Sequence, residues 1–384
     1  MLADAPPHYS TFGPPDCDAF QTLPATSRRT GPGRAWLWAC LALVVVVGLL
    51  CHMLPGRLGP NAQVDLSMSP GSAPHEEWQA YRYMIANGTN YRLYGPASGP
   101  HVVCIHGALD FSYTMDPIAA RLAAYGYRVL NYDLIGCGHT PRSALYPAYG
   151  AKAHIEQLRG LLQALGWADR PVHIIGHSLG AQIAPMYTHE YGNGTVRSLV
   201  LMAPPGFRIS PEFRYMRKLP RSVAGWLLGM MWSSLADQSD SFYARGTAGE
   251  AYVARMTKLH VAQNPELPAA ILGLLMDFPF EVGGQGVAEL GGRSELSVLL
   301  QWATQDQILP RSNLDGWYQL LKKGGACHVA VREYGGVGHA LHMEQPTGLV
   351  VPDIARFLLS LDPPIPENPS LDPEKTEDRI AGVV

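Results

Sequence analysis

The stretch VHIIGHSLGAQI, residues 172–183, contains the pattern that decides the fold of this chain. Its first four residues are rich in β-branched side chains and predict a short buried strand, and a helical pattern follows the turn. Between them, Gly176-His177-Ser178-Leu179-Gly180 has the form G-x-S-x-G, which is informative when it joins a strand to a helix. Such a turn crowds the backbone at the serine, and the helix N-terminus favours negative charge beside it. We therefore predict Ser178 as a nucleophile and Gly176 and Gly180 as the small residues that the turn requires; a tight turn without chemistry is the alternative.

On both sides of this turn, short apolar strands alternate with helical patterns. Such alternation predicts an α/β fold, with a mostly parallel, doubly wound sheet covered by helices on both faces. A leading antiparallel hairpin is expected around an Asn87-Gly88 turn, with strands at Trp78–Ile85 and Tyr91–Tyr94. The other predicted strands are Val102–Ile105, Arg128–Tyr132, Val172–Ile175, Ser198–Met202, Leu296–Trp302 and Val329–Tyr334, and predicted helices include Pro117–Ala124, His154–Leu165 and Leu179–Tyr191.

One interval interrupts the alternation. Residues 205–294 form a link between two strands that is far longer than one helix with short loops, and they read as several helices. We predict an inserted helical cap there, between core segments 76–204 and 295–361. Tails at residues 1–35 and 362–384, both rich in proline, are predicted to be disordered, and residues 55–75 to be a flexible linker.

The core resembles the α/β-hydrolase family, in particular its lipase, esterase and peptidase-like branch with a helical cap. The G-x-S-x-G turn carries this resemblance, together with two other motifs. His106-Gly107-Ala108-Leu109 looks like the HG oxyanion loop of the family, and residues 133–140 (DLIGCGHT) resemble its D-x-x-G-x-G-x-S turn, with Thr140 in place of serine. The family's epoxide hydrolases and haloalkane dehalogenases need a carboxylate nucleophile at the turn, so Ser178 excludes these activities.

The resemblance also implies the partners of the nucleophile. A hydroxyl needs a base to remove its proton, and family order places that base after the last strand, at His339 in a glycine-rich loop. His342 is the alternative base. The acid that orients the base would be Asp306, after the preceding strand, with Asp277 and Asp315 as alternatives.

The oxyanion formed by attack on a carbonyl needs hydrogen-bond donors. The family pattern implies two backbone N–H groups, those of Ala108 and Leu179. Asp110 adjoins this loop; we expect it to be solvated, with contact to substrate as the alternative.

Composition excludes several other classes of function. The formal charge is −3 and no run of Lys or Arg is present, which argues against a nucleic-acid partner. The six cysteines form no CxxC pair and no zinc-finger spacing, and are expected to be free thiols. Neither HExxH nor a Walker or Rossmann glycine pattern occurs, so we predict no metal and no cofactor.

Residues 36–54 (WLWACLALVVVVGLLCHML) contain no Asp, Glu, Lys or Arg. A helix of this length spans roughly 28 Å, enough to cross a bilayer core. We predict a single-pass membrane anchor; a cleaved signal peptide and a buried helix are the alternatives. Three arginines precede the run, so the positive-inside rule places the N-terminus in the cytoplasm and the catalytic domain in the lumen or outside. Sequons at Asn87 and Asn193 would then be open to glycosylation.

The cap contains the uncharged run Ser222–Leu235, which is too short to span a bilayer. Trp226, Met230, Met231 and Trp232 would suit an apolar acyl-binding lid, or else pack the cap onto the core. The predicted function is hydrolysis of lipid or other apolar acyl esters through an acyl-serine intermediate. Acyl transfer, thioester or peptide hydrolysis with the same residues, and a non-catalytic binding module, remain open.

Overall fold

The computed structural model describes residues 72–142, 149–207, 211–238, 250–281, 285–325, 328–344 and 348–362. The chain divides into two units, Met1–Leu66 and Ser67–Val384, and all described residues belong to the second. The predicted anchor, residues 36–54, lies outside the described residues and stays a prediction. None of the described helices is both long and apolar enough to cross a membrane.

A single eight-stranded sheet is the centre of the described chain, in the order β1-β2-β4-β3-β5-β6-β7-β8. The hairpin strands β1 and β2 are antiparallel, β2 pairs antiparallel with β4, and all later pairs are parallel. The predicted mostly parallel sheet is confirmed. The strands are β1 Met84–Ala86, β2 Thr89–Tyr94, β3 His101–Ile105, β4 Arg128–Tyr132, β5 Val172–His177, β6 Val196–Met202, β7 Ser297–Ala303 and β8 Val329–Tyr334.

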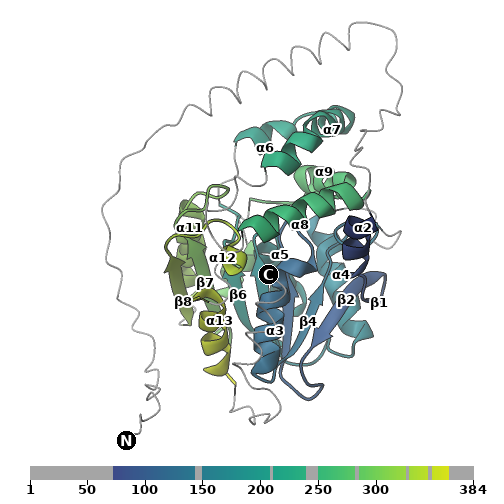
Figure 1. The fold of residues 1–384 in the computed structure, drawn as a ribbon. Helices are drawn as coiled ribbons and strands as arrows, with labels where there is room; N and C mark the ends of the chain where they lie inside the picture. The colour runs from purple at the N-terminus through teal and green to yellow at the C-terminus, as the bar shows by residue number, and fades with distance from the viewer. Residues whose placement is uncertain are drawn as a thin grey trace, which may run out of the picture. The chain divides into compact units, whose positions relative to one another are not determined.

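Helices cover the sheet on both faces (Figure 1). One layer contains α3 and α13, and the other contains α4, α5 and α11. Because helices lie on both sides, every residue of β5 is buried, as expected for a central parallel strand. The core helices are η1 Ser112–Met115, α3 Asp116–Ala124, α4 Ala151–Ala164, α5 Gly180–Tyr191, α11 Ser312–Lys323, α12 Leu341–Glu344 and α13 Val350–Leu359.

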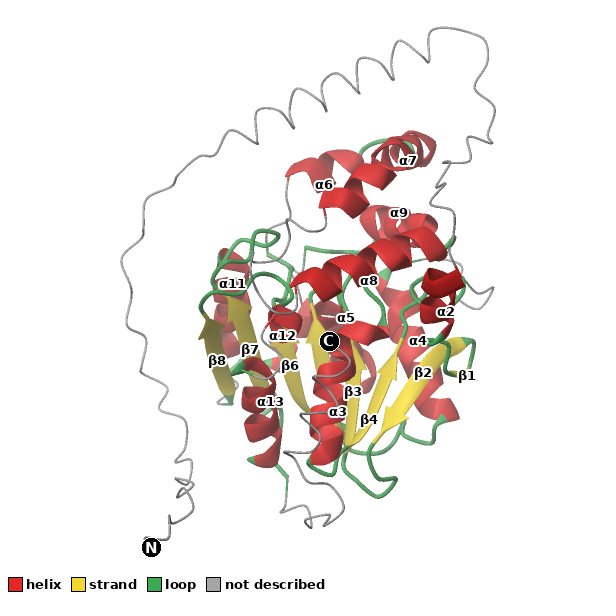
Figure 2. Cartoon of the chain, viewed as in Figure 1, coloured by secondary structure: helices red, strands yellow, loops and turns green. Residues whose placement is uncertain are grey.

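The predicted insertion between β6 and β7 is helical. Four of its helices gather beyond one end of the sheet, toward which the parallel strands point (Figure 2). They are α6 Pro211–Met216, α7 Arg221–Gln238, α8 Glu250–Gln263 and α9 Leu267–Asp277. The last helix of the insertion, α10 Gln285–Leu290, instead contacts α5 and α11 and therefore belongs to the core layer.

The start of the hairpin differs from prediction. Residues Trp78 and Gln79 belong to a helix, α2 Ser72–Gln79, and the first strand begins only at Met84. The same helix takes up residues 72–75 of the predicted linker. Trp78 is 5 % exposed and packs edge-on against Phe111, which lies just before η1. Its aromatic side chain therefore serves a tertiary contact, which the strand propensity of the local sequence does not reveal.

Asp362, the first residue of the predicted C-terminal tail, packs against the core. The Asp362 side chain is 3 % exposed, and one of its oxygens lies 3.1 Å from His173 Nε2 at the start of β5. Residues 363–384 lie outside the described residues.

Candidate active site

The turn after β5 has the strained geometry that its sequence predicts. Ser178 adopts φ +50°, a left-handed conformation that costs a non-glycine residue free energy. A Cβ on Gly176 would lie 2.3 Å from the Gly180 carbonyl oxygen, and one on Gly180 would lie 2.2 Å from the Ile105 carbonyl oxygen. Only glycine fits at either position. The turn thus holds Ser178 at the N-terminus of α5, at the carboxyl ends of the strands.

The structure brings the three predicted catalytic residues together. His339 Nε2 lies 2.9 Å from Ser178 Oγ, and His339 Nδ1 lies 2.8 Å from Asp306 Oδ2. A carboxylate can only accept, so Nδ1 carries the hydrogen and Nε2 is left to accept the serine proton. This is the arrangement in which imidazole acts as a general base toward a hydroxyl.

Asp306 is fixed by its own loop. Its Oδ1 accepts hydrogen bonds from the Ile308 and Leu309 N–H groups, both at 2.9 Å, while Oδ2 faces His339. The two alternative acids lie elsewhere: Asp277 pairs with Arg221 at 3.0 Å, and Asp315 pairs with Arg311. Among the acids considered, only Asp306 therefore reaches the imidazole.

The surroundings of His339 favour its charged form. Burial alone would lower the pKa of His339, but the carboxylates of Asp306, Asp110 and Glu344 together outweigh burial, and the pKa is raised above its usual 6.5. Glu344 holds the loop, because its Oε2 accepts the Gly338 N–H at 2.7 Å. An imidazolium formed during proton transfer is thus stabilised where it forms.

Two further histidines lie beside the base. His177 Nε2 lies 2.9 Å from the His339 carbonyl oxygen, and its ring packs 4.6 Å from that of His342. Burial, and then the nearby His339, lower the pKa of His342 to about 3. His342 has no hydrogen bond to Ser178 within the described chain, so the structure favours His339 over this alternative base.

The two predicted oxyanion donors flank the serine. Leu179 directly follows it, and a Cβ on Gly107 would lie 3.3 Å from Ser178 Cβ, so the loop that contains Ala108 lies against the nucleophile. His106 Nδ1 lies 2.7 Å from the Gly107 carbonyl oxygen. In a trans peptide the N–H points opposite to this carbonyl, so His106 also orients the Ala108 N–H. Neither the Ala108 nor the Leu179 amide donates to another group of the described chain.

Asp110 is buried, which corrects the expectation that it is solvated. Its side chain is 7 % exposed, and a Cβ on Gly107 would lie 3.2 Å from Asp110 Oδ2. Burial raises the pKa of Asp110 to about 7, and the nearby His339 opposes part of this rise. The carboxyl therefore borders the same glycine as the nucleophile.

The D-x-x-G-x-G turn contacts the segment that directly follows the oxyanion loop. Asp133 is fully buried, with Oδ1 accepting from the Ser112 N–H at 2.8 Å and Oδ2 from the His139 N–H at 2.8 Å. Thr140, which stands where the family pattern has serine, accepts the Asn90 N–H through its hydroxyl at 2.9 Å.

Two of the predicted substrate-lining residues are exposed on α7. Trp226 is 38 % exposed and Met230 is 51 % exposed, whereas Leu227, Leu228 and Trp232 of the same helix point inward. The Met231 side chain lies outside the described part. Lining of an acyl pocket by these residues stays a prediction, and the exposure of the first two argues against it.

Comparisons with known proteins complete the description of the site. The model of the alpha/beta hydrolase family matches residues 102–352. Relatives include the human monoacylglycerol lipase ABHD6, 22 % identical over 65 % of this chain and 73 % of its own length. A haloalkane dehalogenase of Mycobacterium marinum is 32 % identical over 28 % of this chain and 35 % of its own, and a proline iminopeptidase of Clostridium botulinum is 27 % identical over 35 % and 43 %. The chain thus spans less than half the length of these last two relatives.

Solved structures with the same fold include two bacterial hydrolases. A thermophilic esterase from Thermogutta terrifontis superposes with a TM-score of 0.58 at 19 % identity, covering 71 % of this chain and 93 % of the esterase. An enol-lactonase from Burkholderia xenovorans gives 0.56 at 19 % identity, with coverage of 72 % and 99 %. At this identity the likeness concerns the fold alone.

Proposed function

This chain belongs to the alpha/beta hydrolase family, and on that premise we propose that it is a serine hydrolase that cleaves carboxylic esters through an acyl-Ser178 intermediate. One observation carries the proposal: the hydrogen-bonded chain from Ser178 Oγ through His339 to Asp306, at 2.9 and 2.8 Å. A binding module has no need for a nucleophile, a base and an orienting acid in this geometry.

The reaction follows from these contacts. His339 Nε2 takes the Ser178 proton as Oγ bonds to the ester carbonyl carbon, and the carbonyl oxygen becomes an oxyanion beside the Ala108 and Leu179 N–H groups. The intermediate collapses, the bond to the alkoxy oxygen breaks, and the imidazolium donates its proton to the departing alcohol. Water then attacks the acyl-enzyme with His339 again as base, which releases the carboxylic acid and restores Ser178.

For the substrate we propose esters of apolar acyl groups. The uncharged stretch of the cap, the predicted anchor and the lipase among the relatives support this class. Each additional buried CH₂ contributes about 0.8 kcal/mol, so each should raise kcat/KM severalfold as long as the pocket accommodates it. The relatives that are named as iminopeptidases make peptide bonds the main competing substrate.

Activity-based labelling is the first test. A fluorophosphonate probe should label the wild-type chain and leave Ser178→Ala unlabelled, although both are folded. Absence of labelling and of ester turnover in the wild type would favour a non-catalytic binding module.

An ester panel of graded acyl length then addresses the substrate class. Medium or long acyl esters should be preferred over acetate. Preference for acetyl esters, for thioesters or for N-terminal peptide bonds would overturn the substrate class and leave the serine mechanism in place. Ester products that appear only when an acceptor alcohol is added would indicate acyl transfer.

We also propose that the catalytic domain is held in the lumen or outside by residues 36–54. The arginines before this run support the orientation, and both sequon asparagines, Asn87 and Asn193, are exposed.

A further inference from the structure

One histidine of the cap contacts the oxyanion loop directly. His260, in α8, is fully buried, and its Nδ1 lies 2.8 Å from the Leu109 carbonyl oxygen. Its Nε2 lies 2.9 Å from the Gly138 nitrogen and 3.1 Å from Asn264 Nδ2. The ring thus joins the cap to two separate core loops.

These contacts determine the protonation of the ring. A carbonyl oxygen can only accept, so Nδ1 carries a hydrogen and donates to Leu109; the Gly138 N–H can only donate, so Nε2 is the acceptor. Both requirements are met by one neutral tautomer. Burial lowers the pKa of His260 to about 4, so this neutral form is present at neutral pH.

The loop that His260 contacts is strained. Leu109 adopts φ +65°, a left-handed conformation that costs a residue other than glycine free energy unless the surroundings hold it. On one side of Ala108, His106 binds the Gly107 carbonyl oxygen; on the other, His260 binds the Leu109 carbonyl oxygen. The Ala108 N–H belongs to the first of these two peptide groups, and the second holds the strained turn that follows it.

We propose that His260 is a positioning residue, which holds the Leu109 turn so that the Ala108 N–H faces the oxyanion. It touches neither the nucleophile nor the base, and acts only through the loop. The inference rests on the proposed function, because it assumes that Ala108 is an oxyanion donor.

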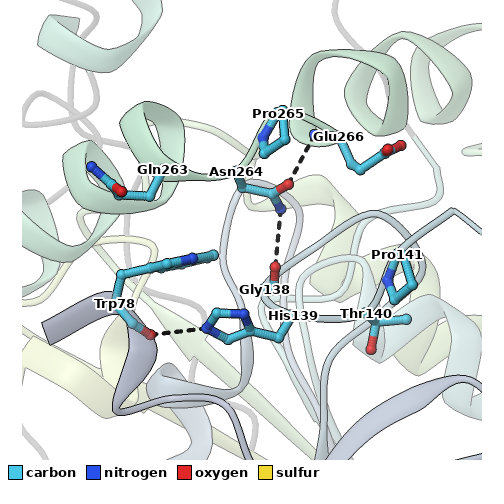
Figure 3. A pocket seen from close by; sticks show the side chains of 9 residues that line it. All are labelled: Trp78, Gly138, His139, Thr140, Pro141, Gln263, Asn264, Pro265 and Glu266. Carbon is cyan, nitrogen blue, oxygen red and sulfur yellow. Dashed lines mark hydrogen bonds between the residues drawn. The ribbon is translucent and has the colours of Figure 1, made fainter. Parts of the chain in front are cut away.

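Neighbouring side chains hold the His260 ring in place. Trp78 of α2 stacks on the ring with centroids 5.7 Å apart, and Phe111 meets it edge-on at 5.0 Å. Asn264 holds the end of α8 on the core, because its Nδ2 donates to the Gly138 carbonyl oxygen at 3.2 Å; within the cap, its Oδ1 accepts the Glu266 N–H at 2.9 Å (Figure 3). Asn264 has no contact with Leu109, but its Nδ2 lies 3.1 Å from His260 Nε2, so its substitution perturbs the Gly138 side of the ring and leaves the bond to Leu109.

Two amide substitutions separate the hydrogen bond of His260 to Leu109 from its hydrogen bond to Gly138. Asparagine places an amide N–H where Nδ1 lies and keeps the donor to Leu109. Glutamine places its carbonyl oxygen near Nε2 and keeps only the acceptor for Gly138.

Loss of one oxyanion donor costs ~10²–10³ in kcat, and displacement of the loop should cost part of this factor. His260→Gln should therefore lower kcat about 10- to 100-fold with KM changed less than about threefold, and slow fluorophosphonate labelling in parallel. His260→Asn should keep kcat within about threefold of wild type.

Thermal melting distinguishes positioning from general stability. The full-length His260→Asn and Asn264→Ala chains should both melt at lower temperature yet retain kcat, because each loses contacts to the Gly138 loop and leaves the Leu109 bond. If the asparagine and glutamine variants lose kcat equally, in step with melting temperature, the positioning role is refuted. If glutamine prevents folding, the comparison of His260→Asn with His260→Ala decides, because both lose the acceptor for Gly138 and only asparagine keeps the donor to Leu109: kcat at least about tenfold lower in the folded alanine variant supports the role, and equal kcat in the two refutes it. A wild type that neither labels nor hydrolyses esters would instead refute the proposed function, and this inference with it.

Discussion

Asp306 holds His339 in a single tautomer, and the structure shows what asparagine would do in its place. Asp306 Oδ1 accepts two backbone N–H groups, from Ile308 and Leu309, at 2.9 Å each. In Asp306→Asn the amide oxygen must stay at these two donors, because an NH₂ group there would face N–H against N–H. The amide N–H₂ is then forced toward His339 Nδ1, which must become an acceptor.

The wrong tautomer disables the base. With Nδ1 accepting, the hydrogen moves to Nε2, which can no longer take the proton of Ser178. Equivalent substitutions in other triads cost ~10⁴ in kcat, or about 5.5 kcal/mol of transition-state stabilisation. Asp306→Asn should therefore lose about 10⁴ in kcat with little change in KM, although it keeps both backbone hydrogen bonds and the fold.

Steady-state kinetics on a chromogenic ester, with circular dichroism as a check on folding, measures this loss. Asp315→Asn is the matched control, because it removes an exposed carboxylate that pairs with Arg311 outside the site. A folded Asp306→Asn enzyme that retains more than about a tenth of wild-type kcat would show that the tautomer argument is wrong.

Three other predictions concern pH, stability and topology. Because the base must be neutral and the pKa of His339 is raised above 6.5, kcat/KM of the wild type should fall as pH drops through that raised value; a pH–rate profile flat from pH 5 to 8 would contradict a histidine base. Burial alone would raise the pKa of Asp362, but His173, Tyr127 and Arg197 together outweigh burial and lower that pKa, so the contribution of Asp362 to stability is present above about pH 4 and lost as pH falls below that. Asp362→Ala should reduce the free energy of unfolding at pH 7 by about 1–3 kcal/mol in urea titrations with unchanged kcat, and equal losses at pH 7 and pH 3 would exclude an ionic contribution. The catalytic domain should resist protease in sealed microsomes if residues 36–54 anchor it as proposed, whereas digestion without detergent would reverse the orientation.

The sequence alone determined the local chemistry of the nucleophile. The glycines two positions before and after Ser178 are required by contacts within a few residues or with the neighbouring strand, so a short motif reports them. The alternation of strands and helices could also be predicted from the sequence, because burial on both faces leaves an apolar pattern in central strands such as β5 and β7. His339 and Asp306 could be predicted only through the order of motifs in a related family, since nothing in their own segments marks them as neighbours of the serine.

Only the tertiary structure decided how the site is supported. Asp110 looked solvated from its loop, yet the folded chain buries it beside Gly107. Trp78 looked like a strand residue, yet it lies in a helix that packs on the oxyanion side of the core. His260 carried no signal at all, because its carbonyl partner at Leu109 is 151 residues away. Hydrophobic periodicity reports which face of an element is buried; it does not report which distant polar group that face will meet, and this depends on how the cap docks onto the sheet.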